Sequence, residues 1–256
     1  MKQNFCNMFK FGSLKALRYK ADTISWFFAD LALYGSLFLT YLLLMQRFDN
    51  INAYSRVQML LYISTYSLIN NFFAVFFSEA TSAYGDKIIS GEIFHYMLMP
   101  FSPTRVILLF NFNLKALIST PFLISVNIFL IRLNEAAPYL KMLYYLSILF
   151  ASFCMYAFFT LLNTFLFYGI RIESLQGVIV QLFSIAEKPD SIFSPFLRNI
   201  FIYLIPAFLF SAVPASIIIK QRFSFEVLYL FAAPVPIWTI AKLLSRHAAR
   251  HYRVDM

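Results

Sequence analysis

The stretch MLYYLSILFASFCMYAFFTLLNTFLFYGI, residues 142–170, contains no charged side chain. Roughly 20 apolar residues in a helix are enough to cross the hydrocarbon core of a membrane. Comparable apolar stretches lie at Ile24–Met45, Val57–Phe77 and Val106–Ile131. Lipid offers the backbone no hydrogen-bond partner, and the alternation of barrel strands is missing here, so these stretches should be helices. The sequence therefore predicts an all-α, polytopic membrane protein.

The composition favours the same class. Hydrophobic residues make up 61% of the 256 residues, charged residues only 13%, and the mean hydropathy is +0.70. A composition this apolar excludes an ordinary soluble domain. The two cysteines, Cys6 and Cys154, have no metal-ligand types at suitable spacing, so we expect neither a disulfide nor a metal site.

The N-terminal segment, residues 1–22, is basic. Its first 20 residues hold five lysines and arginines and no acidic residue, and apolar residues are interleaved with the basic ones. It has neither the continuous apolar core nor the cleavage site of a signal peptide. We expect a short amphipathic helix that lies on the cytoplasmic surface of an anionic membrane.

The C-terminal third is ambiguous by hydropathy alone. Apolar stretches at Leu175–Ala186, Leu197–Ile219 and Phe225–Leu244 allow three spans, or two spans and a re-entrant element. Six spans with both termini cytoplasmic place twelve basic residues inside and eight outside. A seventh span would move the basic tail, residues 245–256, to the outside. The positive-inside rule therefore favours six spans.

The re-entrant element is predicted at residues 194–219, before the last span. Pro195, Pro206 and Pro214 interrupt this stretch, and each proline ring removes a hydrogen-bond donor and bends or ends a helix. Two half-helices should dip into the outer leaflet and return. Such an arrangement requires that the freed backbone groups are buried in protein or face water.

A polar interlude, residues 78–105, separates the second and third spans. Gly85 and Gly91 permit tight turns in it. An apolar strip is expected to be exposed there, consisting of Ile93, Phe94, Tyr96, Met97 and Leu98. Charged residues should surround the strip, namely Glu79, Asp86, Lys87 and Glu92. An exposed strip of this kind suits a groove on a partner protein, and the alternative is an interfacial helix packed under the bundle.

Four stretches resemble the ATP-binding-cassette (ABC) permeases of the type-2 exporter class. They are IISGEIFHYMLMPFSPTRVIL (88–108), with a glycine near its start and Leu-x-Pro at residues 98–100, FSPFLRNIFIYLIPAFLFSAVPASIII (193–219), YKADT (19–23) and RHAARHYRV (246–254). In that family they correspond to the cytoplasmic coupling segment, the proline-marked region before the last span, and the basic segments that flank the first and last spans. The resemblance implies six spans, paired permeases and a separate ATPase.

This division of labour agrees with the residues themselves. The chain has six glycines and no G-x-x-x-x-G-K-[ST] loop, so it cannot bind ATP by that route. We expect no cofactor on this chain, with ATP and Mg²⁺ on partner ABC ATPase subunits. The other expected partners are a second permease copy or a paralogue and membrane lipid, but no nucleic acid. The predicted contact with the ATPase comprises Gly85, Asp86, Lys87, Gly91, Glu92, Phe94, Tyr96, Leu98 and Pro100.

The resemblance also implies the setting of the protein. Residues 1–256 should form a single transmembrane permease domain in the cytoplasmic membrane of a bacterium. Its aromatic content, 32 Phe, 16 Tyr and 2 Trp, suits bulky hydrophobic or amphipathic cargo, although most rings of a membrane protein face lipid. Drug-like compounds, peptides, lipids and sugar-lipid conjugates all stay open as substrates.

Several polar residues fall inside the predicted spans. Asp30 and Lys115 are candidates for a substrate path, because ionisable groups at bilayer depth usually face a cavity or a partner. Pairing of these two residues and snorkelling of Lys115 are the alternatives. Glu173 and Gln181 share a helix face and are weaker candidates for a dimer groove. Hydrogen bonding between helices is the expected role of five asparagines, Asn70, Asn71, Asn111, Asn113 and Asn163.

Two other classes of protein fit less well. A secondary transporter or channel that works without an ATPase normally has several midplane carboxylates or an inverted repeat, whereas the sequence offers Asp30 and no repeat. A membrane enzyme needs clustered catalytic groups. The three histidines, His95, His247 and His251, have no carboxylate or cysteine partner at metal-ligand spacing.

Overall fold

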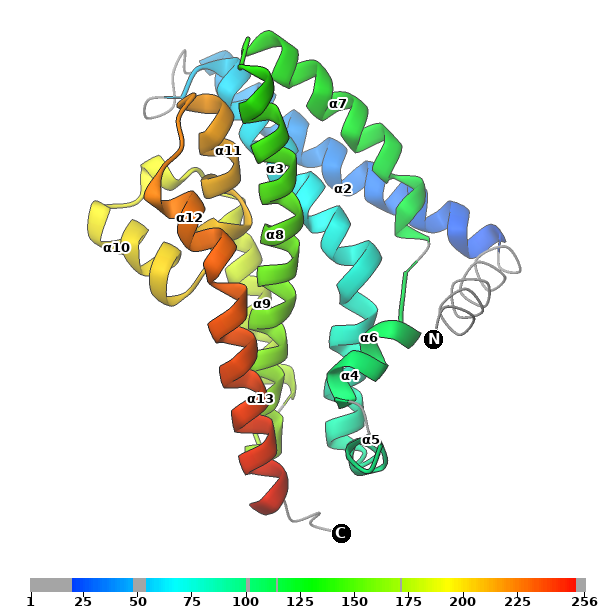
Figure 1. Ribbon diagram of the computed structural model, residues 1–256. Coiled ribbons are helices and arrows are strands. Elements are labelled where there is room, and N and C mark those ends of the chain that lie inside the picture. The colour runs from blue at the N-terminus through cyan, green and yellow to red at the C-terminus, as the bar shows by residue number, and fades with distance from the viewer. Residues whose placement is uncertain (1–19, 48–53, 100–101, 114, 171, 252–256) are drawn as a thin grey trace.

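The computed structural model describes residues 20–47, 54–99, 102–113, 115–170 and 172–251, and every element in these ranges is a helix (Figure 1). Five helical stretches are long and apolar enough to cross a membrane: Thr23–Gln46, Arg56–Ile89, Ala116–Leu133, Pro138–Tyr168 and Phe225–Ala248. The prediction of an all-α, polytopic membrane protein is confirmed. The N-terminal segment up to residue 19 and the last five residues of the tail lie outside the described residues.

The second stretch is longer than the sequence predicted. Helix α3 (Arg56–Phe73) passes through a π-helical turn, η1 (Ala74–Ser78), directly into α4 (Glu79–Ile89). A capping box starts it, since the Ser55 hydroxyl accepts a bond from the backbone N–H of Gln58. The helix continues past the predicted span end at Phe77, and Ala80, Tyr84 and Ile88 extend its buried face. Together α3, η1 and α4 form one continuous helix, here called the rod, which runs most of the length of the bundle (Figure 1).

The predicted third span, Val106–Ile131, is not one helix. Helix α6 (Pro103–Phe110) ends at Asn111, and helix α7 (Thr120–Leu133) begins only after the short 3-10 helix η2 (Ala116–Ile118). The Asn111 amide donates to the carbonyl oxygen of Ile107, 2.7 Å away, and the Asn113 side chain accepts from the backbone of Lys115. Asparagine side chains that bond to nearby backbone in this way compete with helix formation.

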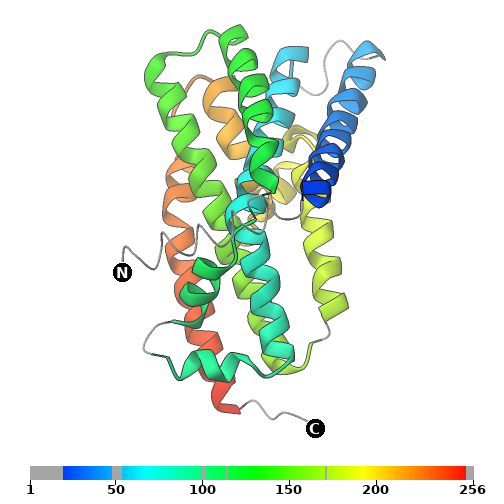
Figure 2. The same ribbon diagram turned by 90° about the vertical axis from the view of Figure 1, so that its right-hand side faces the viewer.

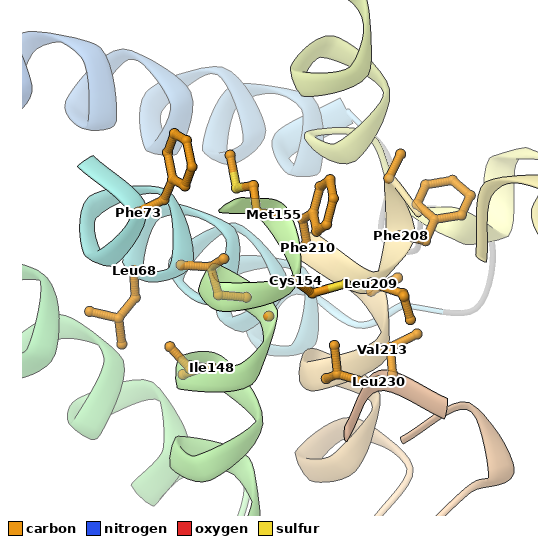
Figure 3. Close-up of a cluster of buried hydrophobic side chains, with 14 of the residues drawn as sticks. Leu68, Phe73, Ile148, Cys154, Met155, Phe208, Leu209, Phe210, Val213 and Leu230 are labelled. Carbon is orange, nitrogen blue, oxygen red and sulfur yellow. The ribbon is translucent and has the colours of Figure 1, made fainter. Parts of the chain in front are cut away.

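Helix α8 (Pro138–Asn163) is the centre of the bundle. It contacts α3, α4, α11 (Ala212–Ile219), α12 (Phe225–Ala232) and α13 (Pro234–His251). Figure 3 shows the core around Cys154 of α8, where apolar side chains from α3, α12 and the segment before α11 meet. Figure 1 shows α2 (Lys20–Arg47) and α7 crossing the bundle obliquely on one side.

The proline-marked region is helical but broken. It consists of α10 (Pro195–Asn199), the π-helical η5 (Ile200–Leu204), a break at Ile205 and Pro206, the 3-10 helix η6 (Phe208–Phe210), and α11. Pro195 starts a helix, and Pro214 lies in the first turn of one, where a missing N–H costs little. The residues from Pro206 to Ile218 are buried in protein. Whether this region is re-entrant in a membrane stays a prediction.

The two ends of the bundle differ. Helix α5 (Ile93–Met97) and the last turns of α13 lie together at one end, here called the α5 end (Figures 1 and 2). The start of α3 and the turn between α7 and α8 lie at the opposite end. Helix α9 (Ile172–Ala186) leads from the α5 end towards α10 and, at about 22 Å, is too short to cross a membrane unaided.

Candidate functional site

The turn between α4 and α5 is built by three residues. Gly91 has φ +74°, a left-handed conformation that favours glycine. Lys87 Nζ lies 3.0 Å from Glu92 Oε2, on the other side of the turn, and 4.8 Å from the centre of the Tyr96 ring. The ion pair and the cation–π contact therefore hold α5 at a fixed angle to the rod.

Gly85 plays a different part from the one expected. It lies within α4, so its prediction as a turn residue is wrong. A methyl group at this position would meet Leu166 Cδ1 at 3.4 Å and Asn163 Oδ1 at 3.6 Å. These are ordinary contact distances, so α4 packs directly against the end of α8 at Gly85, and the Asn163 amide donates to the carbonyl oxygen of Thr81, 2.8 Å away.

Helix α5 exposes less apolar surface than the sequence predicted. Ile93 is fully buried, which contradicts its place in an exposed strip, and Phe94, Tyr96 and Met97 are half-buried. Leu98 is 87% exposed, the largest exposed fraction among the large hydrophobic residues of the described chain. Asp86, Glu92 and His95 are also exposed, and Pro100 lies outside the described residues. The accessible apolar surface of this segment is therefore largest at Leu98, with smaller contributions from Ile89 and Met99, which are 52% and 45% exposed.

A cleft of about 610 Å³, here called the basal cleft, opens at the α5 end. Residues of α4, α5 and α6 form one wall, residues of α13 form the other, and Thr160 near the end of α8 also lines it. Tyr84, Met97 and Trp238 supply aromatic and apolar surface. Three basic residues, Arg105, Lys242 and Arg246, also line it. Its volume lies in the range of small-molecule sites.

A smaller cavity of about 170 Å³ lies between the rod, α8 and α9. Phe73, Phe159 and Phe183 form a cluster of rings at one part of its wall, with centroids 5.4 to 6.4 Å apart. The last residue of the π-helical turn, Ser78, and Gly85 line it as well. This cavity places one predicted site residue, Gly85, beside an apolar chamber.

Of the four predicted substrate-path residues, three have side chains that the structure describes. Asp30 of α2 accepts a hydrogen bond of 2.6 Å from the Ser119 hydroxyl. Lys115, just before η2, is half-buried and bonded through its backbone to Asn113. Gln181 is exposed on α9, and the side chain of Glu173 lies outside the described residues.

Asn71 organises the surroundings of Asp30. Its amide donates to the Ser119 hydroxyl at 2.9 Å and to the carbonyl oxygen of Ala116 at 3.1 Å, and its oxygen accepts from Thr120 at 2.7 Å. The network thus joins α2, α3 and the start of α7. The prediction of hydrogen bonds between helices is confirmed for Asn71 and Asn163 but is wrong for Asn111, which bonds within α6.

Two polar clusters were missed by the sequence analysis. The buried Asn127 of α7 donates to Ser64 at 3.0 Å and to the Tyr144 hydroxyl at 2.7 Å. The other cluster is an ion-pair network centred on Arg198 of α10. An asparagine within a predicted span was a usable signal for the first cluster. No spacing rule pointed to the second, because its members come from separate elements.

No group of three or more metal-ligating side chains lies close together among the described residues. The placement of ATP and Mg²⁺ on a partner, like the whole predicted coupling contact, stays a prediction.

The protein is thus a helical membrane protein with the basal cleft and the exposed Leu98, here called the Leu98 tip, at the same end. The sequence matches the family model described as ABC-2 family transporter protein over residues 31–255. This chain therefore belongs to the ABC-2 family of transporter proteins, and it is a permease-type transmembrane component of transport. Searches of curated proteins and of solved structures returned no match.

Proposed function

We propose that this chain is the transmembrane subunit of an ABC exporter of hydrophobic or amphipathic compounds, driven by separate ATPase subunits. The observation that carries the proposal is the exposed Leu98 at the end of α5, 87% accessible, whereas Ile93 of the same helix is buried. A single large apolar side chain held on a fixed turn is well suited to enter a pocket of a partner.

The rod gives a route for force from α5 into the bundle. Helix α4 packs against α6 and α8, so a push on α5 would be shared by both. Within the π-helical turn, the carbonyl oxygen of Val75 accepts a bond of 3.0 Å from the backbone N–H of Asn113, at the break between α6 and α7. π-helical turns often occur at functional positions. Movement of α5 would therefore reach the region of Ser119 and Asp30.

The same proposal includes six crossings with both termini in the cytoplasm. It is supported by five long apolar helices, by the short α9 with the broken region after it, and by the position of the end of α13 beside α5. In this orientation residues 78–105 and the basic tail, residues 245–256, face the cytoplasm. A second permease copy or paralogue would complete the path, and a bacterial cytoplasmic membrane is the proposed location.

A secondary transporter that works without an ATPase is the second candidate. Asp30 is the observation in its favour, because a half-buried carboxyl in an apolar helix is typical of ion-coupled carriers. The hydrogen bond from Ser119 gives this carboxyl a structural role, which weakens the argument.

A substitution at Leu98 tests the proposal. The tagged chain and its Leu98→Asp variant are purified from membranes of cells that express it natively, and vanadate-sensitive ATP hydrolysis of the preparation is measured. We expect an ATPase to co-purify with the wild-type chain. The variant should retain at most about a tenth of that ATPase activity, since a charge in a hot-spot pocket costs 2 kcal/mol or more. Leu133→Asp, at an exposed leucine of the opposite end, is the matched control and should retain the activity. Solute transport by the isolated chain, driven by an ion gradient, would overturn the proposal in favour of the second candidate.

A further inference from the structure

The basal cleft combines a basic rim with an apolar interior. None of the described residues that line it is acidic. Arg105, Lys242 and Arg246 are exposed, and none of the three forms an ion pair within the described part of the chain. Trp238, Met97 and Met99 provide the apolar contacts. A site with this lining favours a ligand that has an anionic group and an apolar part.

The positive charges come from both walls. Arg105 belongs to α6, whereas Lys242 and Arg246 are one turn apart on α13 and so lie on the same face of that helix. Like charges that face each other across a gap repel, and an anion between them removes this cost. Phosphate accepts hydrogen bonds from arginine in a bidentate manner and pairs well with lysine.

Exposed apolar side chains continue outwards from the cleft on both walls. Phe110 of α6 is 67% exposed, and Ile240 and Leu243 of α13 are 48% and 60% exposed. Ile240 and Leu243 belong to the candidate span Phe225–Ala248, so we expect their side chains to face hydrocarbon. A ligand with acyl chains could therefore place its anionic group at the rim while its chains follow these surfaces.

We propose that the basal cleft binds the phosphate-bearing headgroup of an anionic lipid from the leaflet at the α5 end. Arg105, Lys242 and Arg246 hold the phosphate, and Trp238 with the two methionines contacts the first carbons of the chains. Leu98 itself does not line this cleft, although its neighbours Met97 and Met99 do, and lipid binding there does not require an ATPase.

Trp238 provides a direct readout, because the chain has only one other tryptophan, Trp26. The full chain with Trp26→Phe is placed in nanodiscs of phosphatidylcholine that contain increasing fractions of acyl-brominated phosphatidylglycerol or acyl-brominated phosphatidylcholine. Bromine quenches tryptophan fluorescence only at close contact. We expect phosphatidylglycerol to quench Trp238 with an apparent affinity at least about tenfold higher than phosphatidylcholine, given three basic residues near a membrane surface.

Three variants decide the assignment. Arg105→Gln, Lys242→Gln and Arg246→Gln together should abolish the preference, and Arg246→Gln alone should lower it about fivefold, which keeps the test usable if the triple variant folds poorly. The matched control replaces Arg132, Lys141 and Lys220, at the opposite end, with glutamine. It should keep the preference for phosphatidylglycerol.

Three results would overturn the proposal. They are equal quenching by the two lipids, an equal loss of preference in the control, and displacement of phosphatidylglycerol by excess inorganic phosphate. The last result would assign the cleft to a soluble phosphate compound instead. The measurement uses the permease alone without nucleotide, so its failure would leave the proposed ATPase coupling untouched.

Discussion

Arg198 donates a hydrogen bond of 2.7 Å from Nε to Oδ2 of Asp190, a carboxylate that is almost fully buried. Nη1 of the same guanidinium lies 2.7 Å from Oε1 of Glu226 in α12. The Tyr54 hydroxyl donates to the other carboxylate oxygen of Asp190, Oδ1, at 2.6 Å. Arg198 is thus the single cation between two carboxylates of this network. The network fixes the broken region between α9 and α11 to α12 and to the start of α3.

Replacing Arg198 should therefore destabilise the fold. Arg198→Ala leaves Asp190 buried without its cation, and a cost of about 2 kcal/mol is expected, less than for a fully buried pair because the guanidinium is partly exposed. Thermal unfolding in detergent measures the loss. Because a guanidinium stays protonated over the whole accessible pH range, the loss should persist at alkaline pH. Arg222→Ala, at an exposed arginine of the following loop, is the control and should unfold as wild type does.

The class of the fold followed from the sequence because lipid imposes strong constraints on apolar stretches. The break at Asn111 to Lys115 did not, since hydropathy sums side chains and ignores an asparagine that bonds to its own backbone. In the same way, sequence could mark α5 as apolar but could not tell that Ile93 packs inward while Leu98 stays exposed. The direction of a side chain depends on the turn that precedes it.

The candidate site shows a similar division. The sequence analysis grouped Lys87, Gly91 and Glu92 because they lie within six residues of one another, and the structure brings them together in one turn. The basal cleft was not predicted, because Arg105 and Arg246 are far apart in the sequence and meet only when α6 and α13 pack at the same end. The Arg198 network was hidden for the same reason.

Gly91 should be needed for coupling. A residue with a Cβ at φ +74° costs about 1 kcal/mol or more, so Gly91→Val should change the angle of α5. We expect the variant to insert and fold but to lose most of the ATPase activity that co-purifies with the wild-type chain. Gly169→Val is the matched control for backbone strain, since Gly169 has φ +77°, lies outside the turn between α4 and α5, and has nothing within 4 Å of an added Cβ. Equal losses in the two variants would reduce the effect to general strain.

Two roles of Glu92 can be told apart: pairing with Lys87 in the turn, and direct contact with the ATPase. Glu92→Lys breaks the ion pair with Lys87, and since the Glu92 side chain is 61% exposed the stability should change by less than about 1 kcal/mol. Coupling should nevertheless be lost. The double exchange, Lys87→Glu with Glu92→Lys, restores a pair of opposite charges. Recovery of activity in the exchange would mean that the pair only shapes the turn, whereas continued loss is expected if Glu92 also contacts the ATPase.

The bond between Ser119 and Asp30 distinguishes a structural carboxyl from a transporting one. Asp30→Asn keeps the size of the side chain and can still pair with Ser119, so a structural role predicts a small change in stability, about 1 kcal/mol or less, and nearly normal transport. Ser119→Ala removes the shared hydroxyl and leaves the Asn71 amide with one partner fewer, so it should be the more damaging change. A double-mutant cycle measured by unfolding should give a coupling energy of about 0.5–2 kcal/mol between the two positions. If instead Asp30→Asn folds normally but abolishes transport, and the cycle shows no coupling, the carboxyl belongs to the transport path rather than to the bundle.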